Sequence, residues 1–454
     1  MKFFSMGFML LLLLSLVGYS QNKVLSLKDC IQIALENNVD LNTSRNLARI
    51  AQLGVTDAYS RILPVVNANF SGSKLKFGES TYLSDVPVGV DSLGKVIYEQ
   101  RLVTTEGRER NSYSAGVSVT QNIFDGGYWW NNIRRSKILN EAGQYDLKLS
   151  ENQVIKYVAQ YYYNLLRNIK LLKVDSLAVK RSQDQVDRAQ SMFEIGSVAQ
   201  VDVYRARVNL GQDQITYLNQ KNTLRQSEQL LNLAMGRDPM TPLVIDTVVV
   251  FEPRRVALEE LFNSAFEKQP GLQSQKLKVR AAEFSVALAK SAFLPSVGAR
   301  FSYNRDNELL EKVYSNFDQN WSYSVGLGLS WNLFRGFSDH VNYQTSKIQL
   351  KNSRLALEDY QRTLRSDIRN LYNNYNAILE IVEINKRNLE AAREEFRLAD
   401  ERYRLGSGTS LELREAQVNL TQAEQILVSA EYNAIITYIE LSETIGRVKE
   451  VINL

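Results

Sequence analysis

The stretch WSYSVGLGLSWNLF, residues 321–334, alternates apolar residues with small or polar ones without interruption. Successive side chains of a β-strand point to opposite faces, so this pattern predicts a strand with two different faces. One face would hold only serine, glycine and asparagine. The other would be apolar with aromatic residues at its ends, and it comprises Trp321, Tyr323, Val325, Leu327, Leu329, Trp331 and Leu333.

Three further segments alternate in a similar way and predict strands at about 64–72, 113–124 and 295–304. Alternation of this kind with aromatic ends is what a transmembrane barrel strand needs, so we predict that the apolar face of 321–334 contacts lipid. A strand of a water-soluble sandwich is the alternative, but a sandwich needs about seven strands. Membrane barrels have roughly eight strands or more, so several chains would have to combine their strands in one barrel.

The chain contains one unit twice. RILPVVNANFS at 61–71 matches AFLPSVGARFS at 292–302, an offset of 231 residues. FEIGSVAQVDVYRARVNL at 193–210 matches YRLGSGTSLELREAQVNL at 403–420, an offset of 210. The repeat is the strongest sign of organisation, and the change of offset locates a 21-residue excess within 71–112. We expect this excess to be a surface epitope or a tolerated loop insertion.

The repeat defines the domain organisation. We predict a first structural repeat at 21–236, a linker at 237–256, a second structural repeat at 257–446 and a short C-terminal tail at 447–454. Long segments without proline carry apolar residues at spacings of three and four, which predicts long coiled-coil helices. Their expected ranges are about 128–195, 198–236, 338–405 and 409–446. The first of these helices alone would be ~100 Å long.

The N-terminus reads as a signal peptide at 1–20, because Lys2 precedes an apolar run and small residues precede the expected cleavage before Gln21. A membrane anchor is the alternative, but the run is short for a spanning helix. No cysteine sits at the end of the run, so we do not expect a lipoprotein. We therefore expect an exported chain.

Composition excludes several classes of function. A formal net charge of +4 over 454 residues gives no electrostatic case for nucleic acid. Cys30 and His340 are the only cysteine and histidine, which excludes a disulfide and a multi-histidine or cysteine metal site. We expect no enzyme activity, no catalytic residues, no cofactor and no metal, because no nucleotide-binding motif and no nucleophile pattern occurs.

The order of these features resembles the TolC-like outer-membrane efflux family over essentially the whole mature chain. The resemblance is carried by the duplicated strand–strand–helix–turn–helix unit, by Leu-Pro before the strands, and by the IFDGG and LFRGF segments after them. It implies a mainly α fold with a membrane β-barrel. In such a fold a homotrimer forms a 12-stranded outer-membrane barrel, which a 12-helix α-barrel continues through the periplasm.

The same resemblance implies a function. The chain would be the exit duct of a tripartite efflux pump or type I secretion system, passively conducting small molecules or ions to the exterior. Its partners would be a periplasmic adaptor, an inner-membrane transporter and outer-membrane lipid. A trimeric, barrel-anchored surface stalk or adhesin without transport is the alternative, and we expect it to be silent in conductance measurements.

Glycine-containing turns are expected to end one long helix and start the next in each repeat, with Ser197–Gln200 and Thr409–Glu412 as capping boxes. By resemblance these turns form the tip on which the adaptor docks, and they comprise Gly196, Ser197, Gly406, Ser407, Gly408 and Thr409. Also by resemblance, a periplasmic gate consists of Tyr403, Glu412, Glu415 and Asp202. Capping of the helix start alone is the competing explanation for Glu412.

Overall fold

The computed structural model describes residues 24–248 and 257–452. The predicted signal peptide, linker residues 249–256 and the last two residues lie outside these ranges. The chain divides into two compact units, which we describe separately. The helical unit comprises the chain up to Ala51, Leu139–Val279 and the chain from Asn352 onward, and the sheet unit comprises Gln52–Ile138 and Arg280–Lys351.

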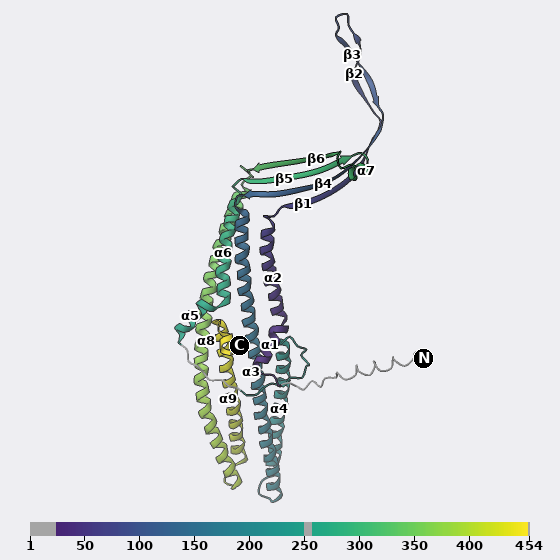
Figure 1. Ribbon diagram of the computed structural model, residues 1–454. Coiled ribbons are helices and arrows are strands. Elements are labelled where there is room, and N and C mark those ends of the chain that lie inside the picture. The colour runs from purple at the N-terminus through teal and green to yellow at the C-terminus, as the bar shows by residue number, and fades with distance from the viewer. Residues whose placement is uncertain (1–23, 249–256, 453–454) are drawn as a thin grey trace, which may run out of the picture. The chain divides into compact units, whose positions relative to one another are not determined.

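The sheet unit is built on four antiparallel strands in the order β1-β4-β5-β6 (Figure 1). Their bounds are β1 Val65–Phe77, β4 Arg108–Asp125, β5 Ser296–Asn307 and β6 Trp321–Ser330. Strands β4 and β5 come from different repeats and pair at the centre, so β1 and β6 are the two edges. Directly opposed residues of paired strands share a face, so the register defines the two sides of the sheet.

The strand predicted over 321–334 is four residues shorter than expected. Strand β6 ends at Ser330, and Trp331 and Leu333 lie beyond it, in the segment before the next helix. The Trp331 indole N–H donates to the Phe293 carbonyl at 3.1 Å, which takes this ring out of the alternating pattern. Of the residues predicted to face lipid, those on the strand itself are therefore Trp321, Tyr323, Val325, Leu327 and Leu329.

The 21-residue excess is not a loop. It forms two additional antiparallel strands, β2 Ser80–Val90 and β3 Val96–Thr105, which make a separate hairpin with a register shift between Pro87 and Gly89 (Figure 1). Strands β1 and β4 also extend beyond their predicted ends, to Phe77 and from Arg108. The four predicted strands form the main sheet, but β2 and β3 were not predicted, because alternating residues such as Leu83 and Leu102 are interspersed with charges.

The loop between β5 and β6 is ordered around one buried arginine, Arg305, which lies on β5 opposite Trp321. Its guanidinium lies 4.6 Å from the Phe317 ring centroid. One nitrogen, Nη2, donates to four backbone carbonyls, those of Lys312, Ser315, Asn316 and Gln319. This loop includes the short helix α7, Glu311–Tyr314. Arg305 thus holds together a segment that has no long element of its own.

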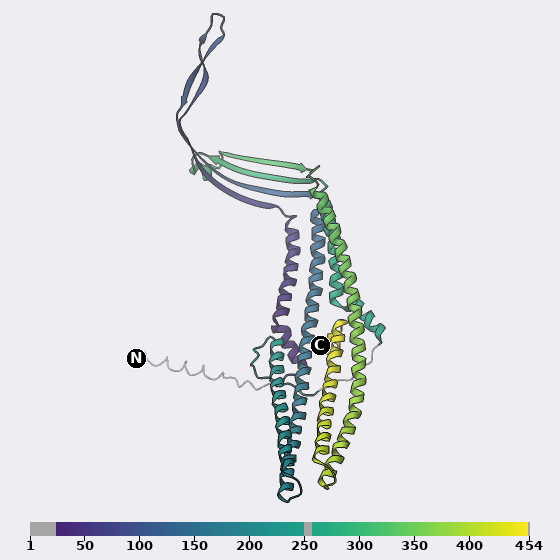
Figure 2. The same ribbon diagram turned by 180° about the vertical axis from the view of Figure 1, so that it is seen from behind.

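The helices confirm the duplication of the fold. Helix α1 Leu27–Asn37 and α5 Leu258–Lys268 both have 11 residues, and α2 Val39–Ser60 and α6 Pro270–Ser291 both have 22. The long helices α3 Tyr128–Glu194 and α8 Ser338–Arg404 both have 67 residues, and α4 Gln200–Ala234 and α9 Ser410–Thr444 both have 35. Figure 2 shows α3 beside α4 and α8 beside α9, each pair joined by a short turn.

Two hydrophobic clusters hold the helical unit together. The larger one joins α1, α3, α4 and α9 through fully buried residues such as Ile31, Ile155 and Leu231. The smaller one joins α5, α6, α8 and α9 through Ala265, Leu272 and Ile368, among others. The sole cysteine, Cys30, is buried in the larger cluster, and burial raises the pKa of its thiol to about 12. A thiol in this environment stays protonated and inert.

Glycines just after the C-terminal ends of α4 and α9 pack in the same way in both repeats. Gly236 has a φ of 73°, and a Cβ there would lie 2.6 Å from the Asn37 carbonyl oxygen. Gly446 has a φ of 79°, and its Cβ would lie 2.8 Å from the Lys268 carbonyl oxygen. Both positions therefore require glycine for two reasons, the left-handed backbone and the close approach of another chain segment.

The segments predicted as linker and tail are partly ordered. Ile245 forms a parallel bridge with Leu25, and the Tyr162 hydroxyl donates to the Asp246 carbonyl at 2.8 Å. Within the predicted tail, residues Val448–Ile452 form the short helix α10. Among the described residues, none of the helices combines the length and the apolar character that crossing a lipid bilayer requires.

Candidate functional site

The two turns that join the long helices have the same backbone. Gly196 and Gly406 have φ values of 74° and 73°. In the first turn the Gly196 and Ser197 N–H groups donate to the Phe193 and Met192 carbonyls, and in the second the equivalent residues do the same toward Tyr403 and Arg402. Both are Schellman motifs, in which the left-handed glycine satisfies the last helix carbonyls.

The turns differ in how the following helix begins. At the second turn, the Thr409 hydroxyl accepts from the Glu412 N–H at 3.1 Å and the Glu412 carboxylate accepts from the Thr409 N–H at 3.3 Å, a complete capping box. At the first turn the prediction of a Ser197–Gln200 capping box was wrong. Helix α4 begins only at Gln200 and its N-cap is Ala199, which has no side-chain acceptor.

Asp202 connects the two turns within the chain. Its carboxylate accepts from the Ser410 hydroxyl at 3.1 Å and from Arg205 at 2.9 Å. Ser410 is the first residue of α9, so an acidic residue of the first repeat holds the helix start of the second. The structure thus brings Asp202 to the second turn, where the other predicted gate residues lie.

Tyr403 lies in the interior beside this connection. Its ring is 6% exposed, whereas its counterpart in the first repeat, Phe193, is 37% exposed. Burial raises the pKa of the Tyr403 hydroxyl, and the negative charge of Asp202 raises it further. The phenol is therefore neutral at physiological pH, and it packs as a buried side chain within the chain described here.

The two predicted gate glutamates have different surroundings. Glu412 is occupied by its capping box and lies 3.6 Å from Arg402. Glu415 is exposed one turn further along α9, and within the described ranges its carboxylate has neither an ion-pair nor a hydrogen-bond partner. Capping therefore accounts for Glu412, whereas no local contact accounts for Glu415.

Below the turns, a buried charged cluster joins the hairpins, and the sequence analysis missed it. Arg414 of α9 donates to both carboxylate oxygens of Asp213 on α4, at 2.7 and 2.9 Å, and both side chains are about 15% exposed. Ser182 also donates to Asp213, and Gln417 donates to Ser182 at 2.9 Å. A bidentate pair with these additional partners is a specific link between helices.

Further polar contacts continue along α3 and α9. They pair Lys156 with Glu443, Arg167 with Asn433, Asp175 with Gln425, and Arg181 with Glu424. Burial raises the pKa of Glu443 despite the opposing effect of Lys156 at 3.4 Å. In sequence these residues look like the solvated flank of a heptad pattern, so no signal distinguished them from surface charges.

The strand β6 has its predicted apolar residues on one open face. Tyr323, Val325, Leu327 and Leu329 are between 64% and 76% exposed, so no part of the sheet unit covers them. Trp321 stacks on Tyr323 with ring centroids 5.9 Å apart. Contiguous apolar exposure of this extent marks an interaction surface and not an ordinary protein exterior.

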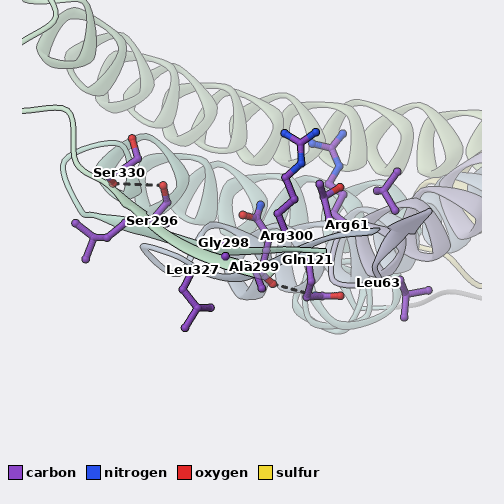
Figure 3. A pocket seen from close by; sticks show the side chains of 15 residues that line it. Arg61, Leu63, Gln121, Ser296, Gly298, Ala299, Arg300, Leu327 and Ser330 are labelled. Carbon is purple, nitrogen blue, oxygen red and sulfur yellow. Dashed lines mark hydrogen bonds between the residues drawn. The ribbon is translucent and has the colours of Figure 1, made fainter. Parts of the chain in front are cut away.

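The opposite face of the sheet is polar and contains a hollow of about 690 Å³. Arg61 and Arg300 point to this side, whereas Leu63 and Leu327 point to the other (Figure 3). The hollow exists because Gly298, Gly326 and Gly328 line it without side chains. Within 24–248 and 257–452 no group of three or more His, Cys, Asp or Glu side chains could hold a metal ion.

Gln121, a polar residue between Val119 and Ile123 on the apolar side of β4, has a local function. Its amide donates to the Ile62 carbonyl at 2.6 Å and to the Asn122 carbonyl at 2.9 Å. It thereby ties the turn that precedes β1 to β4 and places Arg61 at the end of the sheet.

Comparison with known proteins supports one assignment. The profile of the outer membrane efflux protein family matches residues 30–237 and 261–447. The chain is 23% identical to the outer membrane efflux protein BepC of Brucella suis, over 91% of this chain and 84% of BepC. It is 22% identical to the outer membrane protein TolC of Escherichia coli, over 92% of this chain and 86% of TolC.

The fold also matches solved structures. The CmeC outer membrane channel of Campylobacter jejuni superposes with a TM-score of 0.78 at 18% identity, covering 93% of this chain and 86% of CmeC. The open state of the MtrE outer membrane channel of Neisseria gonorrhoeae gives a TM-score of 0.75 at 18% identity, covering 93% of this chain and 89% of MtrE. At these identities the similarity to solved structures establishes the fold.

Proposed function

Because this chain belongs to the outer membrane efflux protein family, we propose that it is the outer-membrane exit duct of a tripartite efflux pump or type I secretion system. It is a channel-forming transport protein of the outer membrane and not an enzyme. The observation that carries the proposal is the four-stranded sheet, which has an exposed apolar face, a polar face and two open edges.

The two edges are the argument for a homotrimer. An unpaired strand edge in lipid leaves backbone N–H and C=O groups without partners, at a cost of several kcal/mol per group. Four strands do not close a barrel, and membrane barrels have roughly eight strands or more. Pairing of β1 with β6 of a neighbouring copy removes the edges, and three copies yield the twelve strands that we expect.

The turns are the proposed docking site for a periplasmic adaptor, which would connect the duct to an inner-membrane transporter. Each turn exposes the same two apolar positions. These are Ile195 and Val201 in the first turn, 80% and 57% exposed, and Leu405 and Leu411 in the second, 83% and 65% exposed. Duplicated apolar residues on a polar tip favour a protein partner. The predicted docking residues Gly196, Ser197, Gly406, Ser407, Gly408 and Thr409 shape the backbone that presents them.

The proposed gate consists of Tyr403, Asp202, Glu412 and Glu415. Asp202, through Ser410, holds the start of α9 in place, which supports a closed arrangement of the second turn. Glu415 has no partner of its own, so three-fold symmetry would make it a ring of free carboxylates that attracts cations. Glu412 would attract cations less than Glu415 does, because its carboxylate caps α9.

Single-channel recording tests the duct and the gate together. The purified protein in planar bilayers is expected to conduct, and a silent protein that forms intact trimers would favour the surface-stalk alternative. Glu415→Gln is expected to weaken block by multivalent cations more than Glu412→Gln does. Equal and unchanged block in both variants would remove these residues from the gate.

A further inference from the structure

In the part of the chain that the structure describes, Arg300 places an unpaired positive charge on the polar face of the sheet. Where all four strands are paired, three rows of residues line this face, and besides Arg300 they contain Val65, Asn67, Asn69, Ser118, Thr120, Ser302, Asn304, Ser322, Ser324 and two glycines. Arg300 is the only charged residue in these rows. Its row places it between Thr120 and Gly326.

The surroundings of Arg300 leave its guanidinium available. Within the described ranges the group has no ion-pair or hydrogen-bond partner. Arg305, further along β5, does have such partners. A Cβ added at Gly326 or Gly328 would meet nothing within 4 Å, so open space surrounds the neighbouring strand. The hollow of about 690 Å³ next to Arg300 is therefore a consequence of these glycines.

Arg61 adds a second charge on the same side (Figure 3). It precedes β1, and Gln121 holds this turn through the Ile62 carbonyl. Its only ion pair in the described ranges is an exposed one with Asp57 at 3.7 Å. Exposed pairs of this kind are weak, so Arg61 is able to contact another anion.

We propose that Arg300, assisted by Arg61, is a binding site for anionic groups, carboxylate or phosphate, on solutes that pass along the polar face of the sheet. This inference rests on the proposed function, because a trimeric barrel turns the residue into a ring of three arginines around the conduit. A guanidinium binds carboxylate and phosphate oxygens in a bidentate manner. Rings of one charge in a pore select ions of the opposite charge.

The site lies near the end of the sheet at which the strands connect to the long helices, since β5 begins at Ser296 and β6 ends at Ser330. The acidic residues proposed for the gate lie in the other unit. A ring of Arg300 side chains would attract solutes that carry the opposite charge. The expected cargo class is therefore solutes that carry at least one negative group.

The test uses the full-length protein in planar bilayers with citrate and inorganic pyrophosphate as blocking anions. Both anions are expected to block the wild-type channel at 0.1 M salt, where charges act over ~10 Å, and not at 1 M salt, where they act over ~3 Å. Arg300→Gln is expected to weaken block by up to roughly fivefold, the change for losing one exposed ionic contact. Arg61→Gln should have a smaller effect.

Two control variants separate charge from disruption. Arg300→Lys keeps the charge and is expected to retain most of the block. Arg101→Gln removes an exposed arginine of the β2–β3 hairpin and is expected to leave block unchanged. Arg101 forms an ion pair with Glu99 at 2.7 Å. Block by pyrophosphate alone would restrict the site to phosphate groups, whereas block by both anions supports a general anion site.

The outcomes distinguish this inference from the proposed function. A conducting channel in which Arg300→Gln leaves anion block unchanged overturns the anion site and leaves the duct intact. A silent wild-type protein overturns the duct, and titration calorimetry with pyrophosphate in detergent then decides the site. Binding that Arg300→Gln abolishes supports the site on its own, and binding that is absent or unaffected overturns both proposals.

Discussion

The turns of the two helical hairpins share a backbone but not their side chains. Gly196 and Gly406 have nearly the same φ and close the same pair of hydrogen bonds. Only the second turn adds a capping box, between Thr409 and Glu412. The comparison teaches that duplication has kept what the backbone requires, whereas the side chains that satisfy free N–H groups have diverged.

The same contrast extends below the turns. The pair Asp213 and Arg414 joins the hairpins. In the opposite repeat, the position that matches Asp213 holds Ala423, and the position that matches Arg414 holds Tyr204. The link therefore exists once per chain and not twice. A symmetric backbone with an asymmetric link allows the two hairpins to respond differently to the same partner.

The largest effect is expected at this asymmetric link. Asp213→Asn removes the partner of a mostly buried arginine, which should lower the free energy of unfolding by about 3–5 kcal/mol. The helical circular dichroism signal during guanidinium unfolding in detergent measures this loss. Glu394→Gln is the matched control, because it breaks an exposed pair with Arg397 in α8 and should cost far less than Asp213→Asn. Equal losses would mean that the buried pair is not the link.

Glycine replacements should have the next largest effect on stability. They test whether both repeats require the same left-handed backbone. Gly236→Ala and Gly446→Ala force a Cβ against backbone in a left-handed conformation, so each should cost about 2–3 kcal/mol. Gly196→Ala and Gly406→Ala face open space but keep a left-handed backbone, so they should cost about 1–2 kcal/mol each. The same unfolding measurement applies. A large difference between the two members of either pair would contradict a common backbone requirement.

The caps should give a smaller and one-sided difference. Thr409→Ala removes a complete capping box and should cost about 1 kcal/mol. Ser197→Ala removes the hydroxyl of the capping box predicted for the first turn, and it should be close to neutral because Ala199 is the N-cap there. Melting temperatures of the two variants are compared directly. If Ser197→Ala lowered the melting temperature as much as Thr409→Ala does, the result would support the capping box that the sequence predicts at Ser197.

The smallest expected difference in stability is that between Glu443→Gln and wild type, and it should depend on pH. Burial raises the pKa of Glu443 in the folded chain, so its protonated form is favoured there and its contribution to stability is lost as the pH rises through that folded value. Glu443→Gln should therefore gain stability relative to wild type between pH 4 and pH 7. The counterpart, Leu233, is 61% exposed, and Leu233→Gln should show no such pH dependence. A difference between Glu443→Gln and wild type that stays constant over this range would contradict a buried carboxylate.

Local patterns made much of the fold predictable. Period-two alternation identified β6, and a repeated motif placed Gly196 and Gly406 in turns, because both signals depend on neighbouring residues only. The extent of β1 and β4 was underestimated, and β2 and β3 were missed. Their side chains, such as Arg101 opposite Ser84, carry charges on a solvent-exposed hairpin that breaks the alternation.

The candidate site was less predictable because its contacts join distant parts of the chain. Asp202 meets Ser410, Arg414 meets Asp213, and Gln121 meets Ile62 across separations that no short window contains. The same helical periodicity suits a buried pair and a solvated charge equally well, so burial decides between them.

Sequence alone thus determined the duplication, the two-faced strands and the glycine turns, since each is encoded by residue type at a regular local spacing. Only the tertiary structure decided which polar side chains are satisfied and which remain available. Satisfaction of a charge depends on what the fold places beside it, and for Arg300 the neighbours on the adjacent strand are glycines.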